Sequence, residues 1–378
     1  MISAGDPARP SLVPMPLTVL TGFLGAGKTT LLNKLVKDPA LAETAVIINE
    51  FGEIGLDHLL VEHIDDNLVL LQSGCLCCTL RGDLMSALEK LLRDLDNRRV
   101  RFRRVIIETT GLADPAPVLH TVMAHPYLVL RFRLDGVVTV VDAVNGLSTL
   151  DSHVESVKQA AVADRIVLTK TDLLDTSERR AMSERLCARL ARLNPAAPVL
   201  EAATGEATPA RLLDCGLYNP ESRIPDVKRW LAEEAYVGVS RHHHDHPHDV
   251  NRHDDRIRAF SLATDVAIPA ASFDMFLELV RATHGPNLLR IKGVVKLAKT
   301  PEAPLVVHCV QHILHPPARL PYWPDGDHRT RLVFITRDVE ERTIRELFAA
   351  FLGAIAPDQP DRAALTDNPL APFGGIDR

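Results

Sequence analysis

The 378-residue sequence lacks the features that would place it in a membrane or on a nucleic acid. Nowhere does it contain the run of about eighteen apolar residues that a membrane-spanning helix needs. Residues 1–16 contain prolines and no apolar signal-peptide core. It also lacks a basic block and carries a formal net charge of −6, which argues against a surface that neutralises phosphates. We therefore expect a cytoplasmic protein that binds neither membrane nor nucleic acid.

Cysteine is scarce, with six in the whole chain, and three of the six stand within four positions at Cys75, Cys77 and Cys78. This distribution does not fit a disulfide framework and indicates reduced thiols with a local task. The solitary Cys187, Cys215 and Cys309 we interpret as structural. A heptad seam is missing too, so the oligomeric state is not predicted.

The hydrophobic content of 46% is ordinary for a globular protein, and the length favours two domains. Short β-branched runs alternate with helical patterns between residues 17 and 220, which predicts an α/β fold with a mostly parallel sheet covered by helices. The predicted strands in this region are Leu17–Leu20, Thr44–Asn49, Leu68–Leu71, Val105–Glu108, Gly136–Asp142, Arg165–Thr169 and Pro198–Glu201.

The pattern changes after Tyr236, where a polar, histidine-rich tract replaces the apolar periodicity. We expect a P-loop domain at residues 1–235, a linker or long loop at 236–256, a smaller α+β domain at 257–355 and a loosely held tail at 356–378. The predicted elements of the smaller domain are strands at Ile257–Ala263, Leu288–Leu297, Leu305–Val310 and Arg331–Thr336, and helices at Ala270–Thr283 and Val339–Phe351.

The most informative motif is Gly22–Thr29, which reads Gly-Phe-Leu-Gly-Ala-Gly-Lys-Thr between an apolar run and a helical pattern. Its glycines allow backbone N–H groups to converge on a phosphate at the N-terminus of the following helix. Lys28 is expected to reach the β- and γ-phosphates and Thr29 to hold Mg²⁺. The alternative is a glycine-rich turn that only connects the strand to the helix.

Glu108 ends an apolar strand and is followed by Thr109-Thr110-Gly111, which favours the Walker B position. Its carboxylate would bind Mg²⁺ through water or orient the attacking water, and the Gly111 amide would contact a γ-phosphate. An acid at a strand end that is satisfied by solvent is the alternative.

The segment Thr169-Lys170-Thr171-Asp172 follows a predicted strand and matches the base-reading loop of GTPases, with threonine where asparagine is commonest. Asp172 can accept the two N–H hydrogens that guanine offers and adenine lacks, which favours GTP over ATP. Because a short hydroxyl does not reproduce every asparagine contact, Thr169 weakens this interpretation. The nucleotide-binding residues predicted from these motifs are Gly22, Gly25, Ala26, Gly27, Lys28, Thr29, Thr30, Gly111, Thr169, Lys170 and Asp172.

The clustered thiolates Cys75, Cys77 and Cys78 are soft ligands that select Zn²⁺, Cu(I) or similar ions. Three sulfurs leave a fourth position for another ligand, which suits a carrier better than a closed structural site. Buried cysteines that act as small hydrophobes are the alternative. A weaker, exchangeable metal site is predicted in the histidine-rich tract, at His242, His243, His244, His246 and His248, against the alternative of a solvated loop.

These motifs occur together and in order with Asn49-Glu50-Phe51-Gly52-Glu53 and with Glu108-Thr109-Thr110-Gly111-Leu112-Ala113-Asp114-Pro115. The set resembles the CobW-like metallochaperone GTPases, which are related to the nickel-delivery GTPases of urease and hydrogenase maturation. The similarity extends through the histidine-rich tract to the C-terminal domain, at Arg290–Gly293 and Trp323-Pro324.

The resemblance implies that residues 49–57 form a switch loop that responds to the γ-phosphate. It also implies that metal binding at Cys75, Cys77 and Cys78 depends on the nucleotide. Many members carry a glutamate directly before Asn49, where this chain has Ile48, so a metal ligand sometimes assigned there is absent. Glu50 and Glu53 are the candidate substitutes.

We hypothesise a GTPase that uses GTP and Mg²⁺ to load a transition metal, Zn²⁺ or Co²⁺, and to deliver it to a client metalloprotein. The catalytic candidates are Lys28, Glu108 and Glu53. Two alternatives are a nucleotide-binding zinc storage or sensor protein, and a P-loop kinase, for which no acceptor site is visible. The smaller domain is expected to dock the client, with His308, His312 and His315 as candidate contact residues that equally suit ordinary strand edges. The sequence identifies neither the physiological metal nor the client.

Overall fold

The computed structural model describes residues 14–49, 69–73, 80–214, 256–311, 313–315 and 317–352. Most of the expected linker, at 236–255, and the expected tail at 356–378 lie outside these residues. Among the helices of the described part, none is long and apolar enough to cross a membrane.

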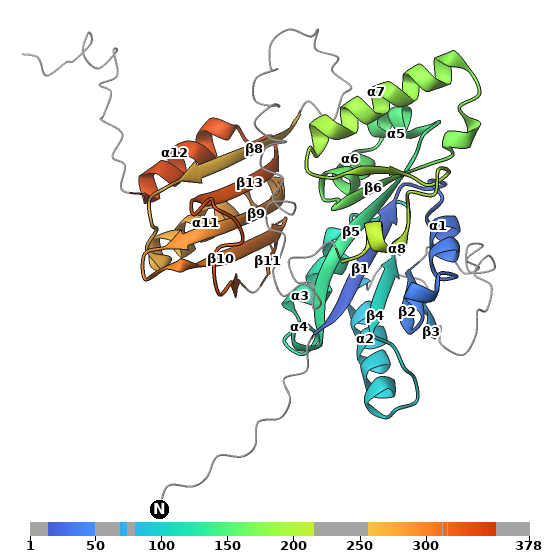
Figure 1. The fold of residues 1–378 in the computed structure, drawn as a ribbon, viewed down its shortest axis with the longest axis horizontal. Coiled ribbons are helices and arrows are strands. Elements are labelled where there is room, and N and C mark those ends of the chain that lie inside the picture. The colour runs from blue at the N-terminus through green and yellow to red at the C-terminus, as the bar shows by residue number, and fades with distance from the viewer. Residues whose placement is uncertain are drawn as a thin grey trace, which may run out of the picture.

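The first unit is built on a seven-stranded sheet whose strands are all parallel, in the order β3-β2-β4-β1-β5-β6-β7 (Figure 1). The predicted α/β fold is confirmed. The strand that leads into the P-loop, β1, lies at the centre, so its carboxyl end is flanked by other strand ends. The strands are β1 (Met15–Gly22), β2 (Thr44–Asn49), β3 (Val69–Ser73), β4 (Arg104–Glu108), β5 (Phe132–Asp142), β6 (Arg165–Thr169) and β7 (Val199–Glu201).

Both faces of this sheet are buried because alternate residues of each strand are apolar on both sides. Leu20 packs on one face with residues of α1 and α8, while Val19 packs on the other with α2 and α3. The helices of this unit are α1 (Lys28–Leu35), η1 (Pro39–Leu41), α2 (Leu80–Asp96), α3 (Ala116–Ala124), α4 (Leu128–Arg131), α5 (Gly146–Ser152), α6 (Val154–Ala161), η3 (Thr171–Leu173), α7 (Ser177–Leu193) and α8 (Pro209–Leu212).

The second unit contains a six-stranded antiparallel sheet in the order β11-β10-β9-β13-β8, with β12 paired to β10. One face of it packs against α11 and α12 around Phe276 and Phe334. Its elements are β8 (Ile257–Thr264), α11 (Ala270–His284), η6 (Gly285–Asn287), β9 (Leu288–Leu297), β10 (Thr300–Val310), β11 (Ile313–Leu314), β12 (Ala318–Arg319), β13 (Thr330–Arg337) and α12 (Glu341–Phe351).

Strands β5 and β10 begin at least four residues before their apolar runs predict. Strand β5 begins at Phe132, four positions before the predicted Gly136, because the polar Asp135 is buried by hydrogen bonds from Thr18 and Arg104. Strand β10 begins at Thr300, and the register with β9 shifts between Thr300 and Leu305. Prolines at 301 and 304 hide this stretch from a pattern-based prediction.

Buried hydrophobic residues of the two units pack together. Residues of α7, including Leu186 and Leu190, belong to the same buried cluster as Leu289 of β9 and Ile335 of β13. This cluster joins the second face of the antiparallel sheet to the first unit, where α7 lies beside β8 (Figure 1). The units are therefore held together by apolar burial, as a domain core is.

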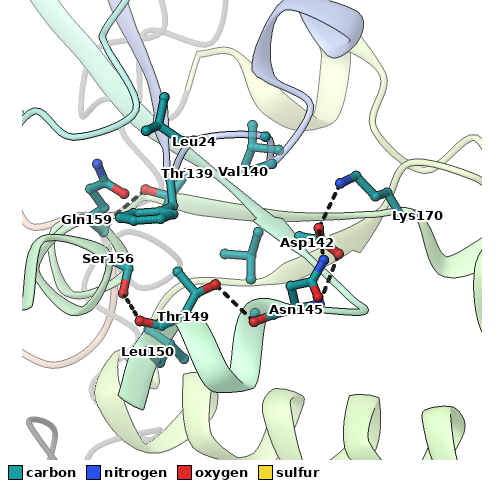
Figure 2. Close-up of a pocket in the computed structure, with 15 residues that line it drawn as sticks. Leu24, Thr139, Val140, Asp142, Asn145, Thr149, Leu150, Ser156, Gln159 and Lys170 are labelled. Carbon is teal, nitrogen blue, oxygen red and sulfur yellow. Dashed lines mark hydrogen bonds and ion pairs between the residues drawn. The ribbon is translucent and has the colours of Figure 1, made fainter. Parts of the chain in front are cut away.

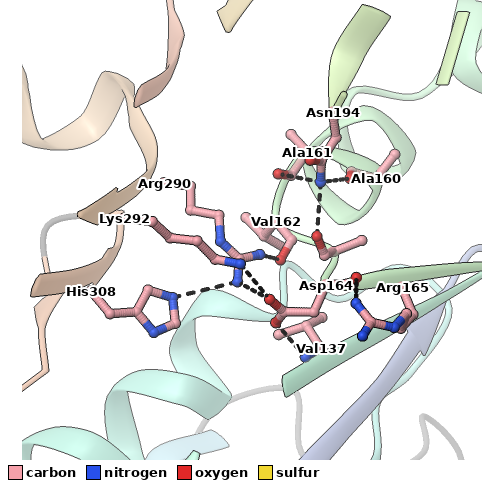
Figure 3. Close-up of polar contacts among 11 residues, drawn as sticks. Val137, Ala160, Ala161, Val162, Asp164, Arg165, Asn194, Arg290, Lys292 and His308 are labelled. Atoms are coloured by element: carbon pink, nitrogen blue, oxygen red, sulfur yellow. Dashed lines mark hydrogen bonds and ion pairs between the residues drawn. The ribbon is translucent and has the colours of Figure 1, made fainter. Parts of the chain in front are cut away.

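A buried ionic cluster crosses the same junction (Figure 3). Asp164, which follows α6, accepts hydrogen bonds from Arg290 Nη2 at 2.5 Å and Lys292 Nζ at 2.8 Å, both on β9. Burial opposes ionisation of this carboxyl, but the charges of Arg290 and Lys292 outweigh it and hold the pKa of Asp164 far below its usual range. Arg290 also donates to the Val162 carbonyl. The second unit thus contacts the end of α6 through buried, charged hydrogen bonds.

We predict that Asp164→Asn destabilises the protein by about 3 kcal/mol, because two buried cations lose their counter-charge while the side-chain volume is preserved. Urea unfolding at pH 7 measures this, and Glu346→Gln in the exposed Arg342 pair on α12, expected to cost under about 1 kcal/mol, is the control. The depressed pKa makes the carboxylate's contribution complete above about pH 4 and lost as the pH falls below that value. The difference between wild type and variant should therefore shrink in acid. A difference near zero at pH 7 contradicts this role.

Candidate functional site

The P-loop joins β1 to α1 in a backbone conformation that depends on glycine. Gly22, Gly25 and Gly27 have φ values of 144°, 71° and 94°, which side-chain-bearing residues rarely adopt. A Cβ atom at Gly22 would overlap the carbonyl oxygen of Val140 on β5. The loop therefore lies directly against the sheet, and α1 begins at Lys28 with its N-terminus facing the loop.

Lys28 and Thr29 occupy the buried start of α1. The ammonium group of Lys28 donates to the Phe23 carbonyl at 3.4 Å, so it lies on the P-loop backbone. The hydroxyl of Thr29 donates to Glu108 Oε1 at 2.7 Å, and Glu108 is only 3% exposed. The sheet thus brings together the two side chains that the sequence assigned to Mg²⁺.

A hydroxyl and a carboxylate are the hard oxygen donors that Mg²⁺ prefers, so Thr29 and Glu108 fit this ion chemically. When bound there, Mg²⁺ would neutralise charge on the β- and γ-phosphates of a nucleotide. The chain's own contribution is to fix both oxygens at the carboxyl edge of the sheet, where β1 and β4 pair with Leu20 opposite Glu108.

Thr169 braces the P-loop. Its hydroxyl donates to the Ala26 carbonyl at 2.6 Å, and it is 8% exposed. Its methyl group lies 3.5 Å from the position that a Cβ of Gly27 would take. The threonine therefore links β6 to the P-loop backbone. The sequence does not predict this contact, because Thr169 is interpreted there only as a residue that lacks some of the contacts of asparagine.

Lys170 has a left-handed backbone, with φ 59°, and its ammonium group pairs with Asp142 Oδ2 at 2.7 Å (Figure 2). Asp142 in turn accepts from the backbone N–H groups of Val144 and Asn145. Burial opposes ionisation of Asp142, but its hydrogen bonds with Lys170 and Asn145 lower its pKa. A fixed carboxylate thus fixes Lys170. Asp172 is exposed in the middle of η3, two residues after Lys170.

A cavity of about 190 Å³ opens beside the P-loop, on the sheet face covered by α5 and α6 (Figure 2). Phe23 and Leu24 line one side, and Thr139, Asp142 and Gln159 line others. Phe23 stacks on His153 with ring centroids 4.4 Å apart. The outer flank of the P-loop is thus supported by an aromatic contact and bordered by open space.

The loop after β4 is pressed onto the P-loop. A Cβ at Gly111 would lie 2.6 Å from the backbone nitrogen of Leu24, so only glycine fits. Gln159 of α6 donates to the carbonyls of Gly111 and Ala113 at 3.3 and 2.9 Å. Any group that moves Gly111 therefore also strains the P-loop or α6.

Several predicted site residues fall outside the part of the chain that the structure describes. They are Glu50, Glu53, Cys75, Cys77, Cys78, His242, His243, His244, His246, His248 and His312. Of the remaining candidates, Thr30 is exposed on the first turn of α1, and Ile48 is 5% exposed in the core. Within the described stretches, no cluster of three His, Cys, Asp or Glu side chains is placed to hold a metal ion.

His308 and His315 lie at the junction of the two units, with parallel rings 4.3 Å apart. Burial lowers the pKa of His315 to about 3 and that of His308 well below its ordinary value. Cys309 is buried, and burial raises its pKa to about 12, while burial also raises the pKa of the half-buried Cys187. Both thiols are poorly suited to react or to bind metal as thiolates.

Asp142 and Gln159 are site residues that the sequence did not reveal. Asp142 ends an apolar strand, as Glu108 does, and this position at the carboxyl edge was an available signal. Gln159 stands inside a helix, and its contact partners are 46 and 48 residues away along the chain. Only the folded arrangement shows that it supports the Gly111 loop.

The fold and the Thr29–Glu108 pair beside the P-loop define a P-loop nucleotide-binding protein. The family described as "CobW/HypB/UreG, nucleotide-binding domain" matches residues 16–201, and "Cobalamin synthesis protein cobW C-terminal domain" matches residues 257–352. The chain belongs to the CobW family, and the resemblance inferred from its motifs is confirmed.

Similar proteins extend along nearly the whole chain. "Zinc chaperone YjiA" of Escherichia coli is 33% identical over 339 residues, which cover 89% of this chain and 98% of the relative. "Zinc chaperone CobW" of a Sinorhizobium species is 31% identical and covers 91% and 99%. A crystal structure of Zn(II)-bound YjiA GTPase from E. coli is similar, with a TM-score of 0.64, 28% identity and coverage of 90% and 99%.

Replacing the Thr169 hydroxyl by a methyl group should loosen the P-loop. We predict that Thr169→Val weakens binding of a fluorescent GDP about fivefold to tenfold, because the lost hydrogen bond to Ala26 is worth about 1 kcal/mol. Thr204→Val, which removes an exposed hydroxyl that donates to Glu201, is the control and should bind as wild type does. Unchanged affinity in Thr169→Val contradicts the brace.

A second prediction concerns the base. Asp172→Asn should weaken guanine nucleotide binding at least about tenfold and favour xanthine nucleotides, because the amide N–H₂ repels guanine N2–H₂ but donates to the xanthine 2-carbonyl. Competition of GTP and XTP against a fluorescent nucleotide measures the preference. Asp175→Asn, at an exposed carboxylate that pairs with Arg179, should leave it unchanged. Retained guanine preference in Asp172→Asn excludes the assigned role.

Proposed function

We propose that the protein is a GTP-hydrolysing metallochaperone that binds a transition metal at Cys75, Cys77 and Cys78 and delivers it to a client metalloprotein. Zinc is the first candidate for the metal, and cobalt the second. The names of its relatives support GTP as the nucleotide and zinc as the cargo. YjiA of E. coli is named a zinc chaperone and its crystal structure is described as that of a Zn(II)-bound GTPase, and CobW of a Sinorhizobium species is also named a zinc chaperone.

The observation that carries the proposal is where three neighbouring strands end. Strands β2, β3 and β4 are parallel and adjacent, with Asn49 opposite Ser73 and Ile48 opposite Glu108. The proposed switch segment begins at Asn49, and Cys75 follows Ser73 by two residues. Both segments therefore leave the sheet at the edge where Glu108 meets Thr29, which supports a link between nucleotide and metal.

The roles of the described residues follow from their positions. Lys28 and the P-loop N–H groups would stabilise the negative charge of the β- and γ-phosphates. Thr29 and Glu108 would hold Mg²⁺, and Asp172 would select guanine. Loss of the γ-phosphate would release the Gly111 loop and the switch segment, and this release would lower the affinity for the metal.

The competing proposal is a zinc storage or sensor protein in which the nucleotide is structural. The two differ in turnover, because a storage protein gains nothing from hydrolysing GTP when metal arrives.

Two variants test the proposed division of labour. Lys28→Ala should lower GTP hydrolysis at least about a hundredfold, since it removes a preorganised charge from the phosphates. Cys77→Ser should keep basal hydrolysis but lose tight zinc binding and zinc-stimulated hydrolysis. Phosphate release with and without zinc, together with zinc titration, measures both.

Cys187→Ser, at a half-buried thiol on α7, is the matched control for Cys77→Ser and should behave as wild type does. Full hydrolysis in Lys28→Ala contradicts the phosphate assignment. Turnover of wild type that zinc does not change supports storage or sensing instead.

A further inference from the structure

The loop from Gly111 to Asp114 is held from the first unit by two neighbouring residues of α6. Both side-chain N–H hydrogens of Gln159 are committed, to the Gly111 and Ala113 carbonyls. Its Oε1 is buried without a hydrogen-bond partner among the described residues. An unsatisfied buried oxygen destabilises a fold and is therefore rare in native proteins. Lys158 Nζ donates to Asp114 Oδ2 at 3.0 Å. Helix α6 therefore fixes this loop at three atoms.

The second unit holds the same loop directly. Gln311, which follows β10, donates from Nε2 to Asp114 Oδ2 at 2.9 Å across 197 residues of sequence. Its backbone has a φ of 52°, in the left-handed region, and its N–H donates to the Leu289 carbonyl while its own carbonyl accepts from the Cys309 thiol. The backbone of Gln311 is therefore held on both sides, and its side chain reaches Asp114 from this fixed position.

A second connection runs through α6 itself (Figure 3). Arg290 contacts the Val162 carbonyl at the end of that helix, and Arg290 and Lys292 hold Asp164 two residues later. Residues 288–311 of the antiparallel sheet thus contact both the loop and the helix that supports it. These contacts are buried or partly buried, so a displacement of the loop is transmitted through packed groups instead of being absorbed by solvent.

We infer that the C-terminal sheet is part of the nucleotide-responsive machinery, with Gln311 as a positioning residue that sets the Gly111–Asp114 loop for the γ-phosphate. The inference rests on the proposed use of GTP at this site. Because coupling between sites is reciprocal, a sheet that favours one loop position also favours one nucleotide, and the nucleotide favours one position of the sheet. A client that binds the second unit would then read the nucleotide state.

The ratio of GDP affinity to affinity for a non-hydrolysable GTP analogue tests this inference. Gln311→Glu keeps the size of the side chain but replaces the amide donor with a carboxylate that repels the Asp114 carboxylate. This substitution should change the ratio of the two affinities about fivefold or more. Gln311→Lys restores a donor and should return the ratio to within about twofold of wild type. If Gln311 had only a structural role, Gln311→Glu would weaken the binding of both nucleotides equally and leave the ratio of their affinities unchanged.

Arg319→Ala is the control, because it removes a polar contact to Thr300 in the same sheet and does not involve Asp114. Hydrogen exchange of wild type covers the case in which Gln311→Glu fails to fold. Residues 288–310 should exchange at different rates with GDP and with the GTP analogue. An unchanged ratio in a folded Gln311→Glu, or identical exchange in the two nucleotide states, overturns the inference.

These readouts do not involve metal. A wild type that lacks zinc-stimulated hydrolysis but shows the shifted ratio contradicts the proposed metal delivery and supports the coupling. Zinc-stimulated hydrolysis together with an unchanged ratio in Gln311→Glu supports the proposed metal delivery and contradicts the coupling.

Discussion

The close approach of the P-loop to its neighbours is the constraint on which the rest of the site depends. Gly22 lies against the Val140 carbonyl, Gly111 lies against Leu24, and Thr169 donates to the Ala26 carbonyl. A loop with three glycines at positive φ would otherwise have many conformations, and these contacts leave few. They also mean that the Gly111 loop, the proposed sensor of the γ-phosphate, is packed against the P-loop that is proposed to bind it. In the proposed mechanism, nucleotide binding and the response to it are therefore properties of one packed unit.

The junction between the two units extends that packing to the C-terminal sheet. Apolar burial along α7 holds the units together, while Asp164, with Arg290 and Lys292, fixes which residues meet. A buried carboxylate with two cations contributes less to net stability than an apolar contact of equal size, but it tolerates few alternative arrangements. The same strand, β9, lies next to β10, which ends one residue before Gln311. The junction is accordingly a structural interface that also connects the Gly111–Asp114 loop and α6 to the second sheet.

The sequence predicted those parts of the fold that local patterns encode. Apolar runs identified the strands, and the glycine spacing around Lys28 located the P-loop, because these signals depend on neighbouring residues. The start of β5 was missed because Asp135 reads as polar until Arg104 and Thr18 are known to satisfy it. The brace at Thr169 and the contacts of Gln159 and Gln311 join residues that are far apart in the chain, so no local pattern encodes them. The cysteine and histidine predictions lie outside the described residues and stay predictions.

The central claim is that the nucleotide determines how tightly the protein holds its metal. Equal metal affinity in two nucleotide states would shift nothing, however tight the binding. Zinc titration of the wild-type protein, with Mg²⁺ and either a non-hydrolysable GTP analogue or GDP, measures the difference directly. The account predicts at least about tenfold tighter zinc binding with the GTP analogue, a coupling of about 1.4 kcal/mol. Identical zinc affinities in the two states would contradict it.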